Sequence, residues 1–167
     1  IGFQCFGNCI KLESVVLSKN LTEMPNYMFV GCQSLKNINI HNGIKKLGAF
    51  TFCDCKSLTE IEISRNISVI QNGCFLNCKN LRKIVLPNTI TKIGWQGFRK
   101  CEALEEIELP DSIEELYDEF IFMGCKRLKK VNIPRKLKSI PTGMFSGCRS
   151  LEYMRIPDNI EIGRAHV

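Results

Sequence analysis

The sequence is poor in the residues that most catalytic and membrane functions need. Its 167 residues include only two histidines and one tryptophan, which leaves little scope for imidazole-based catalysis. No G-x-S-x-G, H-E-x-x-H or glycine-rich phosphate motif is present. No apolar run approaches the roughly 20 residues that a helix needs to cross a bilayer. We therefore predict neither an enzyme nor a cofactor site, and no membrane span within these residues.

The composition is that of a folded, soluble protein. Hydrophobic residues make up 44% and charged residues 24% of the chain, so the apolar content is too high for a disordered protein. Lysine and arginine number 23 against 17 acidic residues, a net charge of +6. The acids are interleaved with the bases, and no aromatic stripe accompanies them to stack bases. We therefore expect no nucleic-acid partner.

Cysteine, by contrast, is abundant and regularly spaced. Seven of the ten cysteines follow one another at intervals of 23 residues, with a single interval of 24. Each of the seven is preceded three residues earlier by phenylalanine and followed three residues later by leucine. These ladder cysteines are Cys9, Cys32, Cys55, Cys78, Cys101, Cys125 and Cys148. Such a period is the signature of a repeat protein, in which each unit buries its apolar face against its neighbours.

Within each repeat, apolar and polar residues alternate over a short segment such as 107–109. Alternation of this kind predicts a half-buried β-strand. Proline often follows at once, as at Pro87 and Pro110, and ends the strand because it lacks an N–H group. A second extended piece follows, such as 90–93, and then a glycine- or proline-containing stretch. We expect that stretch to form a single helical turn or an irregular turn before the phenylalanine.

The repeats define the domain organisation. Residues 1–160 form one solenoid of about seven repeats, and we expect the protein to continue in both directions because neither end carries a polar capping repeat. Residues 161–167 fit no repeat position and read like a translated sequencing adapter, so we interpret them as a non-native tail. The 24-residue interval places one extra residue within 117–121, where it should bulge without disturbing the strand register.

The repeat resembles the BspA-type, or Treponema pallidum-type, leucine-rich repeat. The shared unit is C-x-x-L-x-x-I-x-L-P-x-x-I-x-x-I-G-x-x-x-F, and its best copy is CKNLRKIVLPNTITKIGWQGFRKC, from Cys78 to Cys101. The resemblance covers residues 1–160. One departure is the residue before the phenylalanine, which is usually alanine in the family. Here it is Cys5, Met28, Thr51, Cys74, Gly97, Ile121 or Met144.

The resemblance implies a fold and a class of function. The fold is an α/β, β-rich solenoid: a right-handed coil or horseshoe with one parallel strand per repeat and short turns or single helical turns opposite. Such repeats occur in surface and secreted proteins of bacteria and protists, where they are associated with adhesion to host proteins and cells. The family carries no shared catalytic residues. We therefore expect a cell-surface or secreted location, with a cytoplasmic one as the alternative.

The cysteines have a structural interpretation. We expect the ladder to consist of buried, reduced thiols that act as small apolar side chains, because in-register parallel neighbours suit disulfide geometry poorly. Cys5 and Cys74 occupy one repeat position and are expected to fill the core. Cys53 lies at another position, which we expect to be partly exposed, so it is a candidate reactive thiol. A metal site at Cys53-x-Cys55 lacks further ligands nearby.

Three polar residues on predicted turns could serve either a function or the structure alone. Asn20 and Asn66 stand in glycosylation sequons at one repeat position, which would be used only in a secreted eukaryotic protein. Otherwise asparagine is simply common in this turn. His41 has no evident nucleophile partner, and we expect it to lie on the surface.

The exposed strand residues form the candidate ligand face, because a curved solenoid presents its strands on one extended surface. Two columns of alternating residues define it. They contain Asn37, Asn39, Glu60, Glu62, Lys83, Val85, Glu106, Glu108, Lys130, Asn132, Tyr153 and Arg155. Acids are concentrated before bases along the columns, which suits a protein or glycoprotein with a complementary dipolar face. The alternative is a solvated face that keeps the chain soluble.

Two functions follow from these observations. The first is a recognition module that binds a protein or glycoprotein, in adhesion at a cell surface. The second is a structural spacer, scaffold or intracellular adaptor within a larger multidomain protein.

Overall fold

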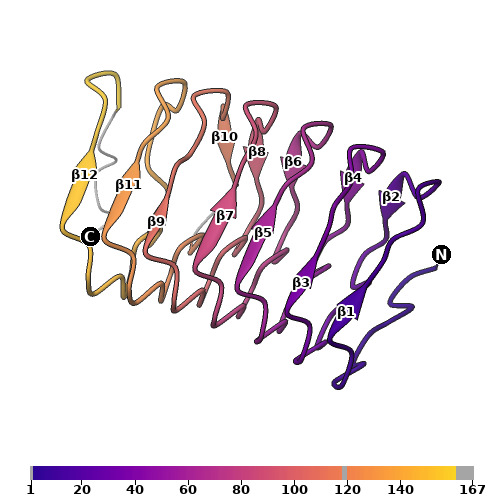
Figure 1. The fold of residues 1–167 in the computed structure, drawn as a ribbon. Helices are drawn as coiled ribbons and strands as arrows, with labels where there is room; N and C mark the ends of the chain where they lie inside the picture. The colour runs from indigo at the N-terminus through magenta and orange to yellow at the C-terminus, as the bar shows by residue number, and fades with distance from the viewer. Residues whose placement is uncertain (1, 118–119, 161–167) are drawn as a thin grey trace.

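A computed structural model describes residues 2–117 and 120–160 as a row of stacked coils, from the N-terminus at the right of Figure 1 to the C-terminus at the left. Twelve short parallel strands lie within the described residues. They are β1 (Ser14–Val15), β2 (Glu23–Met24), β3 (Asn37–Ile38), β4 (Lys46–Leu47), β5 (Glu60–Glu62), β6 (Val69–Ile70), β7 (Lys83–Val85), β8 (Lys92–Ile93), β9 (Glu106–Ile107), β10 (Glu115–Leu116), β11 (Lys130–Asn132) and β12 (Tyr153–Arg155).

The strands form two columns along the solenoid. One column contains β1, β3, β5, β7, β9, β11 and β12; the other contains β2, β4, β6, β8 and β10 (Figure 1). Within the described residues, the strands pair in parallel with equivalent strands of neighbouring coils, as Glu60 does with Lys83 and Glu23 with Lys46, although β3 and β5, β4 and β6, and β7 and β9 are not paired. Equal repeat length therefore places equivalent residues side by side, as the 23-residue period predicts.

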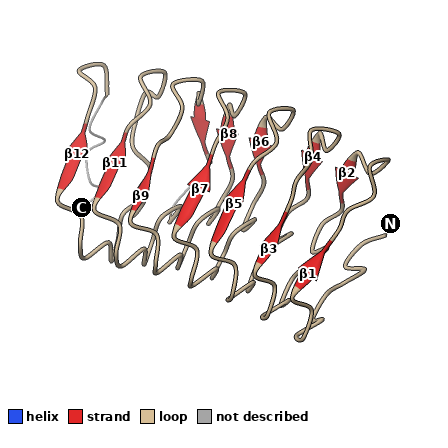
Figure 2. Cartoon of the chain, in the orientation of Figure 1, coloured by secondary structure: helices blue, strands red, loops and turns tan. Residues whose placement is uncertain are grey.

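The turns opposite the strands are irregular. The described residues contain no helix, and hence none that could span a membrane (Figure 2). The expected single helical turn is therefore wrong, and the irregular turn is what the chain adopts. The physical reason is that each turn contains residues at positive φ, such as Tyr27 at 60° and Gly31 at 70°, which a right-handed helix does not accommodate. The N–H of Phe29 instead donates across the coils to the carbonyl of Thr51, at 2.9 Å.

The core is built around a continuous stack of phenylalanine rings. Seven rings, one per coil, follow one another with centroid separations of 5.4–5.9 Å and interplanar angles of 10° or less. The five central rings are fully buried: Phe29, Phe52, Phe75, Phe98 and Phe122. Phe6 and Phe145, in the two end coils, are only partly buried. Leucine, isoleucine and cysteine columns surround the stack and complete one core.

The longer repeat keeps its strand register, as predicted. Lys130 pairs with Glu106 and Val131 with Ile107, a separation of 24 residues. The cross-coil hydrogen bonds of the turn have resumed by Ile121, whose carbonyl accepts the N–H of Phe98 at 3.0 Å. Residues 118–119, in the segment expected to bulge, and residues 161–167, the expected tail, lie outside the described residues.

Truncating the middle of the phenylalanine stack tests how far the core depends on it. We expect Phe75→Ala to lower the free energy of unfolding by about 3–5 kcal/mol, because it removes a fully buried ring together with its stacking contacts to Phe52 and Phe98. Phe145→Ala, in the partly exposed last coil, is the matched control and should cost clearly less. Urea denaturation followed by circular dichroism measures both. Equal losses would show that the buried stack has no special role.

Candidate functional site on the strand face

The strands of the first column present one row of side chains to the core and two rows to solvent. In β5, Ile61 is buried while Glu60 and Glu62 on either side of it are exposed. The same alternation applies along the column, so that eleven of the twelve predicted face residues are exposed and Asn132 is half-buried. The strand geometry thus places these residues on one surface, where Val85 and Tyr153 expose 45% and 61% of their area.

An open groove of about 400 Å³ lies across β3, β5 and β7. Six predicted face residues line it, together with Ile38 and Ile61: Asn37, Asn39, Glu60, Glu62, Lys83 and Val85. Strand pairing here runs β1–β3 and β5–β7. Between these pairs the N–H of Thr59 reaches the carbonyl of Lys36 only at 3.5 Å. The groove therefore lies across a break in the strand ladder, between β3 and β5.

A second hollow, of about 490 Å³, lies at the ends of β11 and β12. Asn132 and Arg155 of the predicted face line it with Asp111, Arg135 and Asp158. The carboxylate of Asp111 is engaged there, because it accepts the backbone N–H of Arg135 at 3.1 Å and lies 4.0 Å from the guanidinium Nε. The strand face thus has an acidic groove in its N-terminal half and a mixed hollow, with two arginines, towards its C-terminal end.

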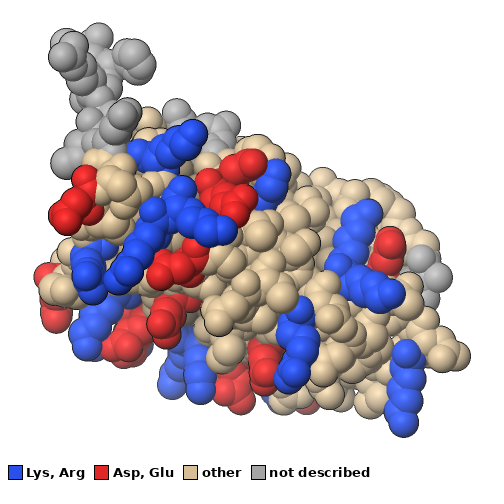
Figure 3. All heavy atoms as spheres, turned by 90° about the horizontal axis from the view of Figure 1, so that it is seen from above, with Lys and Arg blue, Asp and Glu red and all other residues tan. Residues whose placement is uncertain are grey.

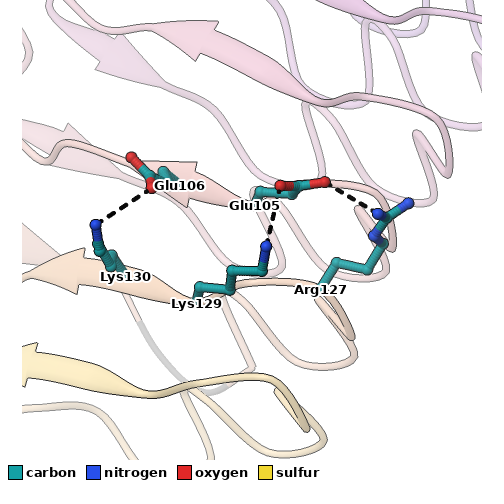
Figure 4. Close-up of polar contacts among 5 residues, drawn as sticks. All are labelled: Glu105, Glu106, Arg127, Lys129 and Lys130. Atoms are coloured by element: carbon teal, nitrogen blue, oxygen red, sulfur yellow. Dashed lines mark hydrogen bonds and ion pairs between the residues drawn. The ribbon is translucent and has the colours of Figure 1, made fainter.

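Ion pairs between coils neutralise part of the predicted dipole. Glu105 lies 3.1 Å from Arg127 and 3.4 Å from Lys129, and Glu106 lies 3.6 Å from Lys130 (Figure 4). Viewed from above, acids and bases are likewise interleaved over the C-terminal coils (Figure 3). Exposed pairs of this kind contribute less than about 1 kcal/mol each. Within residues 2–117 and 120–160, neither Glu60 nor Glu62 takes part in an ion pair, so the groove keeps its carboxylates available.

Asn132 has a structural role that cannot be inferred from its position in the repeat. Its Oδ1 accepts the N–H of Leu109 at 2.8 Å, and its Nδ2 donates to the carbonyl of Leu109 at 2.7 Å. Both bonds lie just beyond β9, which ends at Ile107. The side chain therefore takes the place of main-chain pairing between two coils, and its amide is already occupied.

The ladder cysteines bind the coils to one another. Each thiol from Cys32 onwards donates to the carbonyl of the ladder phenylalanine one coil earlier, at 3.0–3.3 Å; Cys78, for example, donates to Phe52. Burial raises the pKa of the Cys32 and Cys148 thiols to about 11. The pKa values of Cys55, Cys78, Cys101 and Cys125 rise further, for the same reason.

Three expectations about single cysteines need correction. Cys53 is not a reactive surface thiol: it is only 7% exposed, and burial together with Asp54 raises the pKa of its thiol to about 12. The packed neighbouring coils cover its position. Cys5 and Cys9, expected in the core, are exposed because the first coil has a neighbour on one side only. Cys74 is buried as predicted. The described residues bring together no group of three potential metal ligands.

The remaining predicted residues lie on the turns that follow the strands. Asn20 and Asn66 are both exposed, and the Asn66 amide donates to the carbonyl of Asn42 at 2.6 Å. The two ring nitrogens of His41 lie 3.0 Å from the carbonyl of Ser18 and 3.1 Å from the N–H of Gly43. A neutral ring that donates from Nε2 and accepts at Nδ1 satisfies both contacts. His41 therefore ties two coils together.

Comparison with known proteins identifies relatives of this solenoid. The sequence model described as "BspA type Leucine rich repeat region (6 copies)" matches residues 1–120 and 68–166. Among solved structures, the chain is similar to a leucine-rich repeat protein of Treponema pallidum, with a TM-score of 0.79 and 28% identity over 86% of this chain and 71% of that one. No curated protein sequence matches the chain.

Two further solved structures share the architecture. A leucine-rich repeat protein from Bacteroides ovatus aligns with a TM-score of 0.82 and 27% identity, over 92% of this chain but only 41% of that one. A leucine rich cell surface protein from Faecalibacterium prausnitzii aligns with a TM-score of 0.51 and 19% identity, over 90% and 61% of the two chains. At that identity the second likeness concerns the fold alone.

The raised thiol pKa values predict a loss of stability in alkali. A group whose folded pKa is raised contributes its stability fully below its unfolded pKa and loses it as the pH rises towards the folded value. The free energy of unfolding should therefore fall from pH 9.0, the ordinary thiol value, upwards through about pH 11, where Cys32 and Cys148 titrate. In Cys78→Ala the fall should be shallower, by about 1 kcal/mol between pH 9 and pH 10 and approaching about 1.4 kcal/mol per pH unit above that. Urea denaturation at pH 7, 9 and 10 measures this, and identical slopes for both proteins would contradict it.

The two hydrogen bonds between the Asn132 side chain and the backbone of Leu109, which we call the Asn132 clamp, predict that Asn132 stabilises the folded chain. We expect Asn132→Ala to lower the free energy of unfolding by about 1–3 kcal/mol, because a backbone N–H and a carbonyl lose their partner. Asn39→Ala is the matched control, since Asn39 is exposed and occupies the same repeat column. Its effect should stay within about 0.5 kcal/mol. Thermal and urea unfolding of the two variants decide the matter, and equal effects would argue against the clamp.

Proposed function

Because the chain belongs to the BspA-type leucine-rich repeat family, we propose that it is a non-catalytic module that binds a protein or glycoprotein through its strand face. Leucine-rich repeats of this family form a repeat-based module suited to protein interaction. The setting we propose is adhesion or recognition at a cell surface, or after secretion, in keeping with the resemblance drawn from the repeat.

The groove across β3, β5 and β7 is the observation that carries this proposal. Its volume of about 400 Å³ falls within the usual range for binding sites of roughly 300–1,000 Å³. Its walls combine exposed carboxylates, amides and one lysine with the apolar surface of Val85. Such a mixture offers an ion pair, directional hydrogen bonds and an apolar contact within a single small area.

The ligand that fits this groove is an extended segment with a basic side chain. Glu60 and Glu62 project from the same side of β5, and no ion pair among the described residues occupies them. A lysine or arginine of the ligand would lie between them. The amides of Asn37 and Asn39 would hydrogen-bond its main chain, and an apolar residue would cover Val85. Charge complementarity of this kind determines the partner and the association rate more than the final affinity.

Charge reversal within the groove tests the placement of the site. Peptides of twelve residues displayed on phage are selected on the wild-type chain, and their dissociation constants are measured by fluorescence anisotropy. We expect Glu60→Lys/Glu62→Lys to weaken the selected peptides by about tenfold or more, since two like charges would face the basic side chain. Glu106→Lys/Glu108→Lys alters the same two columns two coils further on and should have little effect. Both variants should keep the wild-type melting temperature within a few degrees.

The outcomes separate the alternatives. A loss with Glu106→Lys/Glu108→Lys but not with the groove variant would move the site towards the C-terminal coils. No loss with either would contradict a strand-face site and favour the spacer or scaffold function. For adhesion itself, the wild type and the groove variant are tested on surfaces coated with fibronectin, laminin or collagen. Binding to none of them, or binding that the groove variant retains in full, would count against the proposed role.

A further inference from the structure

The net positive charge of the chain is concentrated on one edge of the solenoid. In each coil this edge consists of the seven residues from two before to four after the ladder cysteine. These segments, which we name the basic edge, are 7–13, 30–36, 53–59, 76–82, 99–105, 123–129 and 146–152. They hold eleven of the 23 basic and five of the 17 acidic residues, so their excess equals the whole net charge of +6.

The middle coils contribute cations that no ion pair occupies. Lys79, Arg82 and Lys100 are exposed and form no ion pair within the described residues. The coils are in register here, since the N–H of Ala103 donates to the carbonyl of Lys79 at 3.0 Å. Glu102 pairs with Lys126 at 2.8 Å. Its pKa is lowered by Lys126 first and then by Lys79 and Lys100. Lys126 is therefore engaged by Glu102, whereas Lys79 and Lys100 act on that carboxylate only as neighbouring positive charges.

Lys100 occupies a backbone position that does not suit lysine. Its φ is 59°, in the left-handed region, where a residue with a long side chain is strained and glycine or asparagine is not. The equivalent residues of the other coils are small or short: Asn8, Gly31, Asp54, Asn77, Gly124 and Gly147. Lys100 is thus the one long, charged cation in this column.

The basic edge has the chemistry of a surface for a linear polyanion. None of its segments contains an aromatic residue, so it offers no platform on which nucleobases could stack. Apolar residues that could insert into a membrane are likewise sparse, since Ile10 is the one large apolar side chain on it that is strongly exposed among the described residues. Successive coils repeat at the strand spacing of about 4.8 Å, so that cations from neighbouring coils lie close together along this edge.

We propose that the basic edge binds a linear sulfated polysaccharide, with Lys79, Arg82 and Lys100 as its central contacts. Sulfate groups along a flexible chain meet a row of cations without base stacking or membrane insertion. Lys79, Arg82 and Lys100 do not line the strand-face groove, so the two proposals are tested by different variants.

Heparin binding measured by isothermal titration calorimetry and by salt elution tests the proposal. We expect Lys79→Gln/Arg82→Gln/Lys100→Gln to bind heparin about tenfold more weakly at physiological salt and to lose up to about three units of the salt-dependence slope. Lys19→Gln/Lys45→Gln/Arg65→Gln is the matched control. It removes the same charge from exposed residues outside the basic edge and should stay close to wild type.

The single variant Lys100→Asn gives a sharper test, because it separates stability from binding. Asparagine tolerates positive φ, so the variant should melt about 2–4 °C higher, whereas its heparin affinity should fall. A merely structural lysine would not produce these opposite changes.

Four outcomes would overturn the proposal. They are no heparin binding by the wild type at physiological salt, equal losses in the triple variant and its control, unchanged affinity for chemically desulfated heparin, and equally tight binding of duplex DNA or of anionic vesicles. Glu60→Lys/Glu62→Lys should leave heparin binding intact, so failure of the groove would not be mistaken for failure of the basic edge.

Discussion

Equal coil length is the constraint on which the rest of the structure depends. A step of 23 residues places each phenylalanine ring on the ring before it and each ladder thiol beside the phenylalanine carbonyl of the previous coil. The carbonyl of Phe52, for example, accepts both the N–H of Cys55 and the thiol of Cys78. Cysteine fits this column because its side chain is small enough for the core and still donates a weak hydrogen bond. The one 24-residue step keeps both contacts, because Phe122 still stacks on Phe98 at 5.4 Å and Cys125 still donates to the carbonyl of Phe98 at 3.2 Å. Its extra residue precedes Phe122, so the spacing from ring to thiol within the coil is unchanged.

The core could be predicted from the sequence because every apolar column repeats in it. The Phe, Leu and Ile columns identify the buried side of each coil, and the alternation around Ile61 identifies the exposed rows. The turns could not be predicted so well, because their shape depends on backbone φ. The signal was nevertheless present: glycine, asparagine and aspartate share the column of Gly31, Asp54 and Asn77. A column of that composition is typical of left-handed residues and is incompatible with a helical turn.

At the candidate site, residues at the same repeat position differ in their contacts, so the repeat position alone does not predict the role of a side chain. Asn39 and Asn132 occupy the same repeat position, yet only Asn132 clamps the backbone of Leu109, because β9 is shorter than β11. Similarly, Glu60 and Glu106 are equivalent by position, but Glu106 has Lys130 within 3.6 Å. Such differences arise from contacts between neighbouring coils. A repeat pattern does not record these contacts, because it describes only what the coils have in common. Cys53 belongs to the same class, since its burial depends on the coils that cover it.

A solenoid built in this way can separate stability from recognition. The columns that repeat are those that the core needs, so residues that vary from coil to coil are free to serve a ligand. Variation alone is a weak argument, because a solvated spacer also varies. Lys100 is a stronger one: a spacer has no reason to place a lysine at positive φ when asparagine or glycine fills the position in other coils. Lysine is the one long side chain in that column of glycine, asparagine and aspartate, and the charge that it adds to the basic edge is what the proposed polyanion would use.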